Sequence, residues 1–204
     1  MAMNNFDFTP YFDKVTESLK KIDQDALNKL VEIIFDCRDS ANTIYIFGNG
    51  GSAATASHVA GDFMKGISYQ LEKRFKVICL SDNIPGTSAI SNDLSYDEVF
   101  IEPLKTYLSK NDVVIGISGS GNSLNVLKAM EYAKSTGAIT VALCGYKGGK
   151  IKEIADLAIH VPVEDMEITE DIHLIIFHAI KQKINLKLKG ENYSMGNNYD
   201  KRVK

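Results

Sequence analysis

The side chains best suited to chemistry lie in two helical segments of the chain. His58 and Asp62 are four residues apart in a segment rich in helix formers, which places both side chains on one helix face. A later apolar segment contains Glu170, His173 and His178, and a polar residue on a buried helix face needs a partner. Imidazole and carboxylate groups act as general acids and bases and are ligands that zinc prefers. The two segments therefore predict an acid–base or metal-binding site.

The helix rise limits how these residues combine. Glu170 and His178 are eight residues apart, so about 12 Å separates their Cα atoms. Both reach one metal ion only if it lies midway; otherwise they serve different parts of a site or face sites in different subunits. The alternatives are a surface contact between His58 and Asp62 and a hydrogen-bonded histidine in the core. We interpret His160, in the last expected strand, as structural.

A first Gly/Ser loop, residues 48–53, follows a strand expected at 43–47. Asn49, Gly50, Gly51 and Ser52 lead from it into an expected helix over 52–65. The glycines permit close backbone approach, and the unpaired N–H groups of a helix start attract an anion. Ser52 is a candidate N-cap or direct ligand. Taken alone, the loop also fits a dinucleotide-binding fingerprint.

A second Gly/Ser loop, residues 118–123, follows a strand expected at 112–117. Its hydroxyl and N–H donors, from Ser118, Gly119, Ser120 and Ser123, are suited to one small anion. A dinucleotide enzyme would also place an acidic residue at the end of the second strand, but Asp82 comes too late for that role. Two such loops therefore favour a phosphate group; a Ser/Gly turn without a ligand is the alternative.

The elements that position these residues alternate along the chain. Two amphipathic helices, over 11–21 and 25–37, are expected first. Strands then follow at 43–47, 75–80, 112–117, 138–143 and 157–161, with helices at 52–65, 85–91, 96–108, 122–136 and 168–188. This order predicts an α/β fold with a doubly wound, parallel, five-stranded sheet, whose ligands bind at the carboxyl ends of the strands near a switch point. The opening helices pack either within the subunit or against a symmetry mate.

Composition narrows the class of protein. The 204 residues are 45% hydrophobic and 24% charged, which predicts one domain over residues 1–188 (helices over 1–40, sheet and helices over 41–188) and a flexible polar tail over 189–204. A net charge of −3 gives no reason to expect nucleic acid or a membrane as a partner. No basic segment followed by an apolar run opens the sequence and no 18-residue apolar stretch occurs in it, so the protein is expected to be neither exported nor membrane-spanning. Cys37, Cys79 and Cys144 are expected to be buried, reduced thiols, which predicts a cytoplasmic location.

These motifs together resemble those of the sugar isomerase (SIS) fold and, within it, the phosphoheptose isomerases that act on sedoheptulose 7-phosphate. The resemblance extends from the opening helices to about Lys187. It rests on GNGGSA at 48–53, His58, the pair Asn92 and Asp93, SGSGNS at 118–123, GYKGGK at 145–150 and EDIHLIIFH at 170–178.

The resemblance implies an aldose–ketose isomerase that forms D-glycero-D-manno-heptose 7-phosphate through an enediol, in a pathway to lipopolysaccharide or capsule. It implies that the sugar phosphate is held by Asn49, Gly50, Gly51, Ser52, Asn92, Asp93, Ser118, Gly119, Ser120, Ser123 and Glu170. One zinc ion per active site would be held by His58, Asp62, Glu170 and His178, with Asp62 and His178 in acid–base roles. Members of the family are typically homotetramers with active sites at subunit interfaces.

Four positions depart from the family pattern. The family usually has Glu at the position of Asp62, Thr at Gly119, Gln at Glu170 and an Arg near Gly66. Asp is one methylene shorter than Glu, and Glu170 would add a negative charge to the metal shell. These changes leave the isomerase of another phosphosugar as one alternative. A non-catalytic sugar-phosphate sensor or protein-interaction module is the second; it would need the loops but not the acid–base residues.

Overall fold

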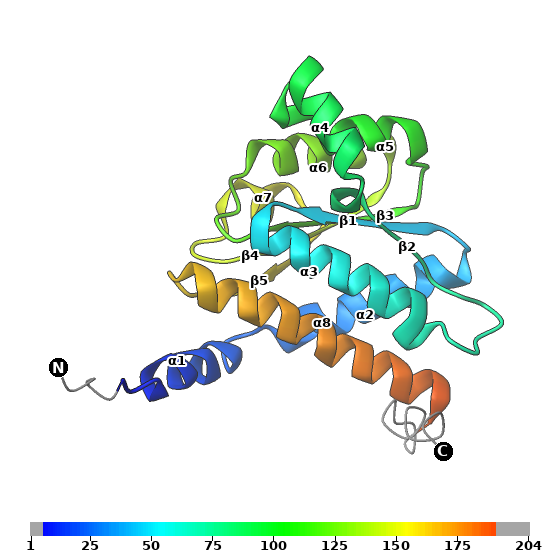
Figure 1. Cartoon of the computed structure of the whole chain (residues 1–204). Coiled ribbons are helices and arrows are strands. Elements are labelled where there is room, and N and C mark those ends of the chain that lie inside the picture. The colour runs from blue at the N-terminus through cyan, green and yellow to red at the C-terminus, as the bar shows by residue number, and fades with distance from the viewer. Residues whose placement is uncertain (1–5, 191–204) are drawn as a thin grey trace, which may run out of the picture.

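A five-stranded, all-parallel sheet forms the centre of the computed structural model, which describes residues 6–190 (Figure 1). Its order is β2-β1-β3-β4-β5. The strands are β1 (Thr43–Gly48), β2 (Lys76–Cys79), β3 (Val113–Ser118), β4 (Ile139–Cys144) and β5 (Leu157–His160). Each lies within two residues of its predicted bounds, and the predicted doubly wound α/β fold is confirmed.

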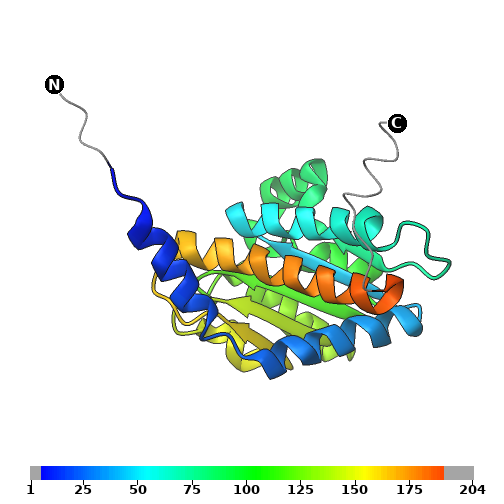
Figure 2. The same cartoon turned by 90° about the horizontal axis from the view of Figure 1, so that it is seen from below.

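Helices cover both faces of the sheet, which creates two hydrophobic cores (Figures 1 and 2). One face packs against α2 (Gln24–Asp39), α3 (Gly50–Gly61) and α8 (Met166–Lys189). The other packs against α5 (Ile101–Tyr107), α6 (Leu124–Thr136) and α7 (Gly149–Ile154), with α4 (Ile84–Asp93) beyond them. Successive strand residues serve opposite cores: Ile46 belongs to the first and Phe47 to the second. This two-sided burial explains why the strands are almost wholly apolar.

Two helices differ from their predicted form, and two further short elements were not predicted. The helix predicted over 52–65 ends as α3 and continues as a π-helical turn, η1 (Asp62–Ile67). The helix predicted over 96–108 is divided into a 3₁₀ turn, η3 (Tyr96–Glu98), and α5. Two short elements, η2 (Leu80–Asp82) and α7, were not expected. Segments of three to six residues carry too little periodicity to be recognised.

The two opening helices pack differently. Asp23 caps α2, accepting hydrogen bonds from the N–H groups of Asp25 and Ala26. The apolar side of α2 lies in the core of its own subunit. In contrast, α1 (Thr9–Leu19) projects beyond the sheet, and among its residues only Ser18 is buried (Figure 2). The apolar side of α2 is therefore buried within its own subunit, while most of α1 stays exposed.

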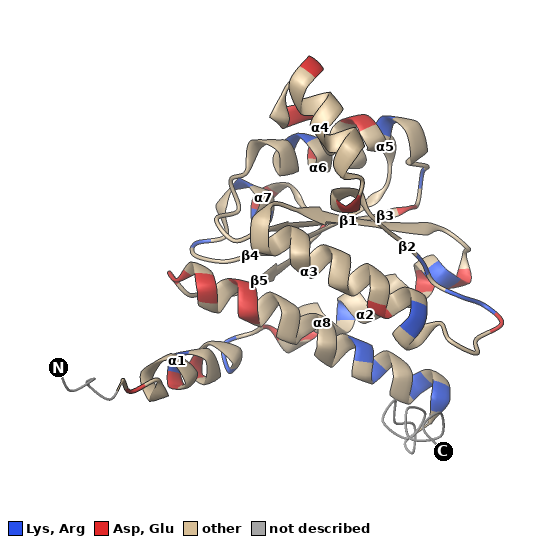
Figure 3. Ribbon diagram, viewed as in Figure 1, with Lys and Arg blue, Asp and Glu red and all other residues tan. Residues whose placement is uncertain are grey.

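Charge is distributed unevenly along α8 (Figure 3). Its first half carries acidic residues, whereas lysines occupy its second half. This distribution opposes the partial charges at the helix ends and favours a long helix. No helix within residues 6–190 combines the length and apolar character that crossing a membrane requires.

The cysteines are buried and free, as predicted. Burial raises the pKa of Cys144 to about 11, so its thiol stays protonated. Residues 191–204 of the predicted tail lie outside the described part of the chain, while Lys189 ends α8.

Candidate active site

The strand order brings the two Gly/Ser loops side by side. In the sheet, β1 lies between β2 and β3, so the connections leave in opposite directions and a switch point lies between β1 and β3. Gly48 at the end of β1 pairs with Ile117, immediately before Ser118. Both loops therefore begin at the same edge of the sheet, as the sequence predicts.

The first Gly/Ser loop forms the end of β1 and the first turn of α3. A Cβ atom on Gly48 would lie 2.6 Å from Cβ of Ser52 and 2.8 Å from the Ile117 carbonyl oxygen, so only glycine fits there. The N-cap of α3 is Asn49, and the interpretation of Ser52 as N-cap is wrong. Ser52 instead lies within the helix and is buried. The unpaired N–H groups at the start of α3 therefore lie next to the end of β3.

A pair of asparagines joins the first Gly/Ser loop to α6, the helix that follows the second loop. Asn49 and Asn125, near the start of α6, exchange side-chain hydrogen bonds of 2.9 and 3.0 Å. The hydroxyl of Tyr96 donates a third bond, of 2.8 Å, to Oδ1 of Asn49. Asn125 is buried, so the pair is a fixed connection rather than a solvent contact. Neither Asn125 nor Tyr96 was predicted from the sequence, because each lies outside the recognisable loops.

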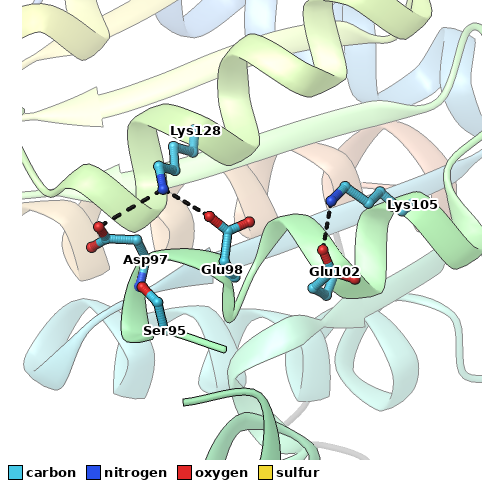
Figure 4. Close-up of polar contacts among 6 residues, drawn as sticks. All are labelled: Ser95, Asp97, Glu98, Glu102, Lys105 and Lys128. Atoms are coloured by element: carbon cyan, nitrogen blue, oxygen red, sulfur yellow. Dashed lines mark hydrogen bonds and ion pairs between the residues drawn. The ribbon is translucent and has the colours of Figure 1, made fainter. Parts of the chain in front are cut away.

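The turn that carries Tyr96 is held by its neighbours (Figure 4). Ser95 caps it, accepting a 2.9 Å hydrogen bond from the N–H of Asp97. From α6, the ammonium of Lys128 lies 2.7 Å from Glu98 and 3.8 Å from Asp97. It holds the pKa of the Glu98 carboxyl below its usual range. The position of Tyr96 is therefore coupled to α6, which follows the second Gly/Ser loop.

Two of the three hydroxyls of the second Gly/Ser loop face each other. Ser118 Oγ lies 3.1 Å from Ser123 Oγ and accepts a 3.2 Å hydrogen bond from the N–H of Gly121. Ser120 Oγ accepts from the N–H of Asn122 at 3.2 Å. A pocket of about 370 Å³ adjoins the outer side of the loop, lined by Ser120, Asn122, Tyr146, Lys147, Gly149 and Glu164. The loop thus pairs two of its hydroxyls, and its third serine, Ser120, lines an accessible pocket.

The acid–base candidates come together where α3 and α8 run side by side. His58 Nε2 lies 2.9 Å from His178 Nε2. Oδ2 of Asp62 lies 3.4 Å from the first of these nitrogens and 3.6 Å from the second. We call His58, Asp62 and His178 the trio. At 2.9 Å the two imidazoles either share one proton or direct both lone pairs at a cation.

The trio has the dimensions of a metal shell. A tetrahedral zinc ion with ligand distances near 2.0–2.1 Å separates its ligand atoms by about 3.3 Å. The observed separations of 2.9, 3.4 and 3.6 Å bracket that value. Two imidazoles and one carboxylate also form a donor set that suits zinc. The residues present therefore fit a metal ion.

Glu170 lies elsewhere along α8. Its carboxylate lies against Gly51, in the first turn of α3, where any Cβ would collide with it. His58 follows two turns later, so Glu170 of the same chain is not brought together with the trio. Burial, reinforced by Glu167 and Asp171, raises the pKa of Glu170. Within one subunit, Glu170 adjoins the first Gly/Ser loop.

Asn92 and Asp93 end α4, where the side-chain amide of Asn92 donates a 2.7 Å hydrogen bond to the carboxylate of Asp93.

His160 bonds the carbonyl of Tyr146 at 2.9 Å, in keeping with a structural role. His173 is buried, and neither ring nitrogen has a hydrogen-bond partner.

Lys181 is a contact of the trio that the sequence did not reveal. Its ammonium lies 2.5 Å from Oδ1 of Asp62. Lysine is common on helices, and the three-residue spacing from His178 becomes informative only once Asp62 is known to face both.

Comparison with known proteins extends these observations. A family model of the SIS domain matches residues 10–145, more than half of the chain. A phosphoheptose isomerase from Helicobacter pylori strain P12 is 37% identical over 175 residues, 85% of this chain and 90% of that protein. A probable phosphoheptose isomerase from Thermoplasma volcanium is 36% identical over 174 residues, 85% of this chain and 88% of that protein. The structure of a phosphoheptose isomerase from Neisseria gonorrhoeae aligns with a TM-score of 0.80 at 28% identity, covering 87% of this chain and 96% of the other.

Proposed function

The chain belongs to the SIS-domain family and, within it, to the phosphoheptose isomerases, and from this membership we propose that it interconverts sedoheptulose 7-phosphate and D-glycero-D-manno-heptose 7-phosphate. The observation that carries the proposal is the trio, with His58, Asp62 and His178 within 4.8 Å of one another. A phosphosugar isomerase needs such a group in addition to a phosphate site, whereas a sugar-phosphate sensor needs only the phosphate site.

Phosphate binding is assigned to the two Gly/Ser loops. Asn49 to Ser52 supply the start of α3, and Ser118 to Ser123 supply hydroxyls and backbone N–H groups. The fixed connection between Asn49 and Asn125 supports a joint role for the loops. We assign Asn92, Asp93 and Glu170 to the sugar portion of the substrate.

The reaction moves one proton from C1 to C2 and a second from the C1 oxygen to the C2 oxygen. In the ketose-to-aldose direction, a base removes a proton from C1 while an acid protonates the C2 carbonyl oxygen, which gives the enediol. An acid then returns a proton to C2, while the C1 hydroxyl loses its proton and becomes the aldehyde. Asp62 and His178, whose side chains approach to 3.6 Å, share the acid and base roles.

A zinc ion would be held by the trio. When bound, it polarises the carbonyl and hydroxyl oxygens of the substrate. Glu170 would join the same shell only if another subunit supplied it, because in its own chain it lies beside Gly51.

We further propose a cytoplasmic homotetramer with active sites at subunit interfaces, whose product supplies heptose for lipopolysaccharide or capsule. The exposed aromatic side chains of α1 support an assembly, and the three buried, free cysteines suit a reducing compartment.

The test is NMR of sedoheptulose 7-phosphate with the purified protein, with and without added zinc. We expect the aldoheptose phosphate to appear, faster with zinc. The double variant Asp62→Asn with His178→Gln should lose turnover at least 10³-fold while still binding the sugar phosphate. Glu131→Gln, an exposed carboxylate on α6, is the matched control and should retain activity. Binding without turnover by the wild type would favour a sensor, and turnover by the double variant would contradict the assigned residues.

A further inference from the structure

Lys181 makes a close ion pair with the proposed catalytic carboxylate. Its ammonium lies 2.5 Å from Oδ1 of Asp62, and the two side chains are only 22% and 19% exposed. Most surface ion pairs contribute little, because water and mobility weaken them. A pair this well covered is held in one arrangement and is therefore suited to fixing the direction of a carboxylate.

The ion pair divides the two oxygens of Asp62 between different partners. Oδ1 accepts from Lys181, and Oδ2 faces His58 and His178 at 3.4 and 3.6 Å. Any rotation of the carboxylate about its terminal bond, other than a half-turn that exchanges its two equivalent oxygens, would break the bond to Lys181. The lysine thus keeps Oδ2 directed at the two imidazoles.

Gly66 provides the space that Lys181 occupies. A Cβ atom at this position would lie 2.9 Å from Cε and 3.1 Å from Nζ of Lys181, and 3.4 Å from Oδ1 of Asp62. Gly66 lies in the π-helical turn that Asp62 begins, so the turn places this gap beside the carboxylate. The backbone of Gly66 does not have a positive φ, so this glycine is needed for space rather than for conformation.

We propose that Lys181 is a positioning residue. Its side chain occupies the space that the missing side chain of Gly66 leaves, and its ammonium holds Asp62 so that Oδ2 faces the histidines. The inference rests on the proposed function, since it deepens the role of the same site. It also gives the trio a neighbouring positive charge, which opposes the binding of a divalent cation. Lys181 therefore favours catalytic geometry at the expense of metal affinity, and these two effects can be measured separately.

The experiment compares Lys181→Met, Gly66→Ala and the double variant with the wild type. Lys183→Met removes an exposed lysine of the same helix and is the matched control. For each protein, kcat and KM are measured with sedoheptulose 7-phosphate, and zinc affinity is measured by titrating the metal-free protein. Thermal unfolding is followed in parallel.

We expect Lys181→Met to lower kcat at least tenfold, to change KM less than threefold and to bind zinc at least threefold more tightly. Gly66→Ala should reproduce all three effects, because the new methyl group displaces the lysine. It should add nothing in the Lys181→Met background, where there is no ammonium to displace. Lys183→Met should match the wild type.

Two results would overturn the inference. An unchanged kcat in Lys181→Met would show that Asp62 does not need the lysine. Weaker zinc binding with a lowered unfolding temperature would show that Lys181 only supports the local structure. If the wild type itself does not convert the sugar, the proposed function fails separately. The inference is then decided by zinc affinity, which must still rise in both single variants and no further in the double variant.

Discussion

Asp62 contacts nitrogen atoms from two helices: Nε2 of His58 on α3, and Nε2 of His178 and Nζ of Lys181 on α8. A single carboxylate therefore connects the two helices at the candidate active site. Its side chain is 19% exposed, whereas those of His58 and His178 are 49% and 44% exposed. The two histidines are thus the more accessible members of the trio, and the Asp62 carboxylate is the more buried one.

His173 lies on α8 like His178 but, unlike the histidines of the trio, is buried. It is 1% exposed, and both ring nitrogens lack hydrogen-bond partners. Burial lowers its pKa to about 4, with the nearby Cys144 backbone opposing the shift. The ring is therefore neutral at physiological pH. His173 therefore lies on the buried side of α8 and is not a member of the trio.

Stability should consequently depend on pH through His173. Its pKa falls from 6.5 to about 4 on folding, so between these values the unfolded chain binds more protons than the folded chain. The free energy of unfolding must then decrease as the pH falls, by about 2 kcal/mol at pH 5 from this group. Urea unfolding of wild type and His173→Leu at pH 5 and pH 8 measures the effect. The variant should lose about 2 kcal/mol less than the wild type between the two pH values.

Asn185→Leu provides the control for this comparison. Asn185 is also buried on α8 and its Oδ1 lacks a partner, but its amide does not titrate. This variant should keep the pH dependence of the wild type. Equal losses in the wild type and in His173→Leu would assign the acid sensitivity to other groups.

At the scale of elements, the parts that local patterns determine were predictable. Apolar strands and the Gly/Ser loops are continuous in sequence, and their order gave the parallel sheet and the edge at which both loops lie. Asn125, Tyr96 and Lys181 were not predictable, since each acts through a residue at least 47 positions away. The separation of Glu170 from the trio was foreseen only as one of three arrangements. Excluding a metal ion shared midway within one chain required the packing of α3 against α8.

The interlock between the second Gly/Ser loop and the loop before α7 shows how two connections fix each other. Gly121 has φ +70°, and a Cβ there would collide with the Gly148 carbonyl group and lie 3.0 Å from Cα of Gly149. The N–H of Ile151 donates to the Gly121 carbonyl at 3.0 Å. The loop therefore owes its shape to backbone-to-backbone packing as well as to its serines.

Gly121→Ala should disrupt the loop. The methyl group would meet rigid backbone and force an L-residue into the left-handed region, so we expect a loss of about 2 kcal/mol or more in stability. The affinity for sedoheptulose 7-phosphate should fall at least tenfold, since the serines would shift.

Gly61→Ala is the control: its φ is −61° and nothing lies within 4 Å of the added Cβ. It should gain about 0.5–1 kcal/mol and bind normally. Urea unfolding and calorimetric titration measure both quantities; normal affinity in Gly121→Ala would show that the interlock is not required.

At the scale of the whole molecule, α1 is a helix that the subunit leaves largely uncovered, since only Ser18 of it is buried. It is attached to α8 by a 2.7 Å hydrogen bond from Tyr11 to Asp171, and to the N-cap residue of α8 by a 2.8 Å ion pair between Lys14 and Asp165. Phe8 and Phe12 are 67% and 64% exposed. Exposed aromatic clusters of this kind mark interaction surfaces, and the proposed tetramer provides the occupant, a second copy of the chain.

Replacing both aromatics, Phe8→Ser with Phe12→Ser, should therefore weaken the assembly. We expect the wild type to sediment as a tetramer and the double variant as a smaller species, because the apolar surface that joins the copies is lost. Turnover per chain should fall with dissociation if the active sites are completed at the interfaces, even though the trio within each chain is untouched. Tyr107→Ser, which alters a 62% exposed aromatic on α5, should change neither mass nor turnover. Sedimentation and activity measured over one concentration series test both statements. A monomeric wild type would refute the tetramer, and a dissociated variant with full turnover would place the complete active site within one subunit.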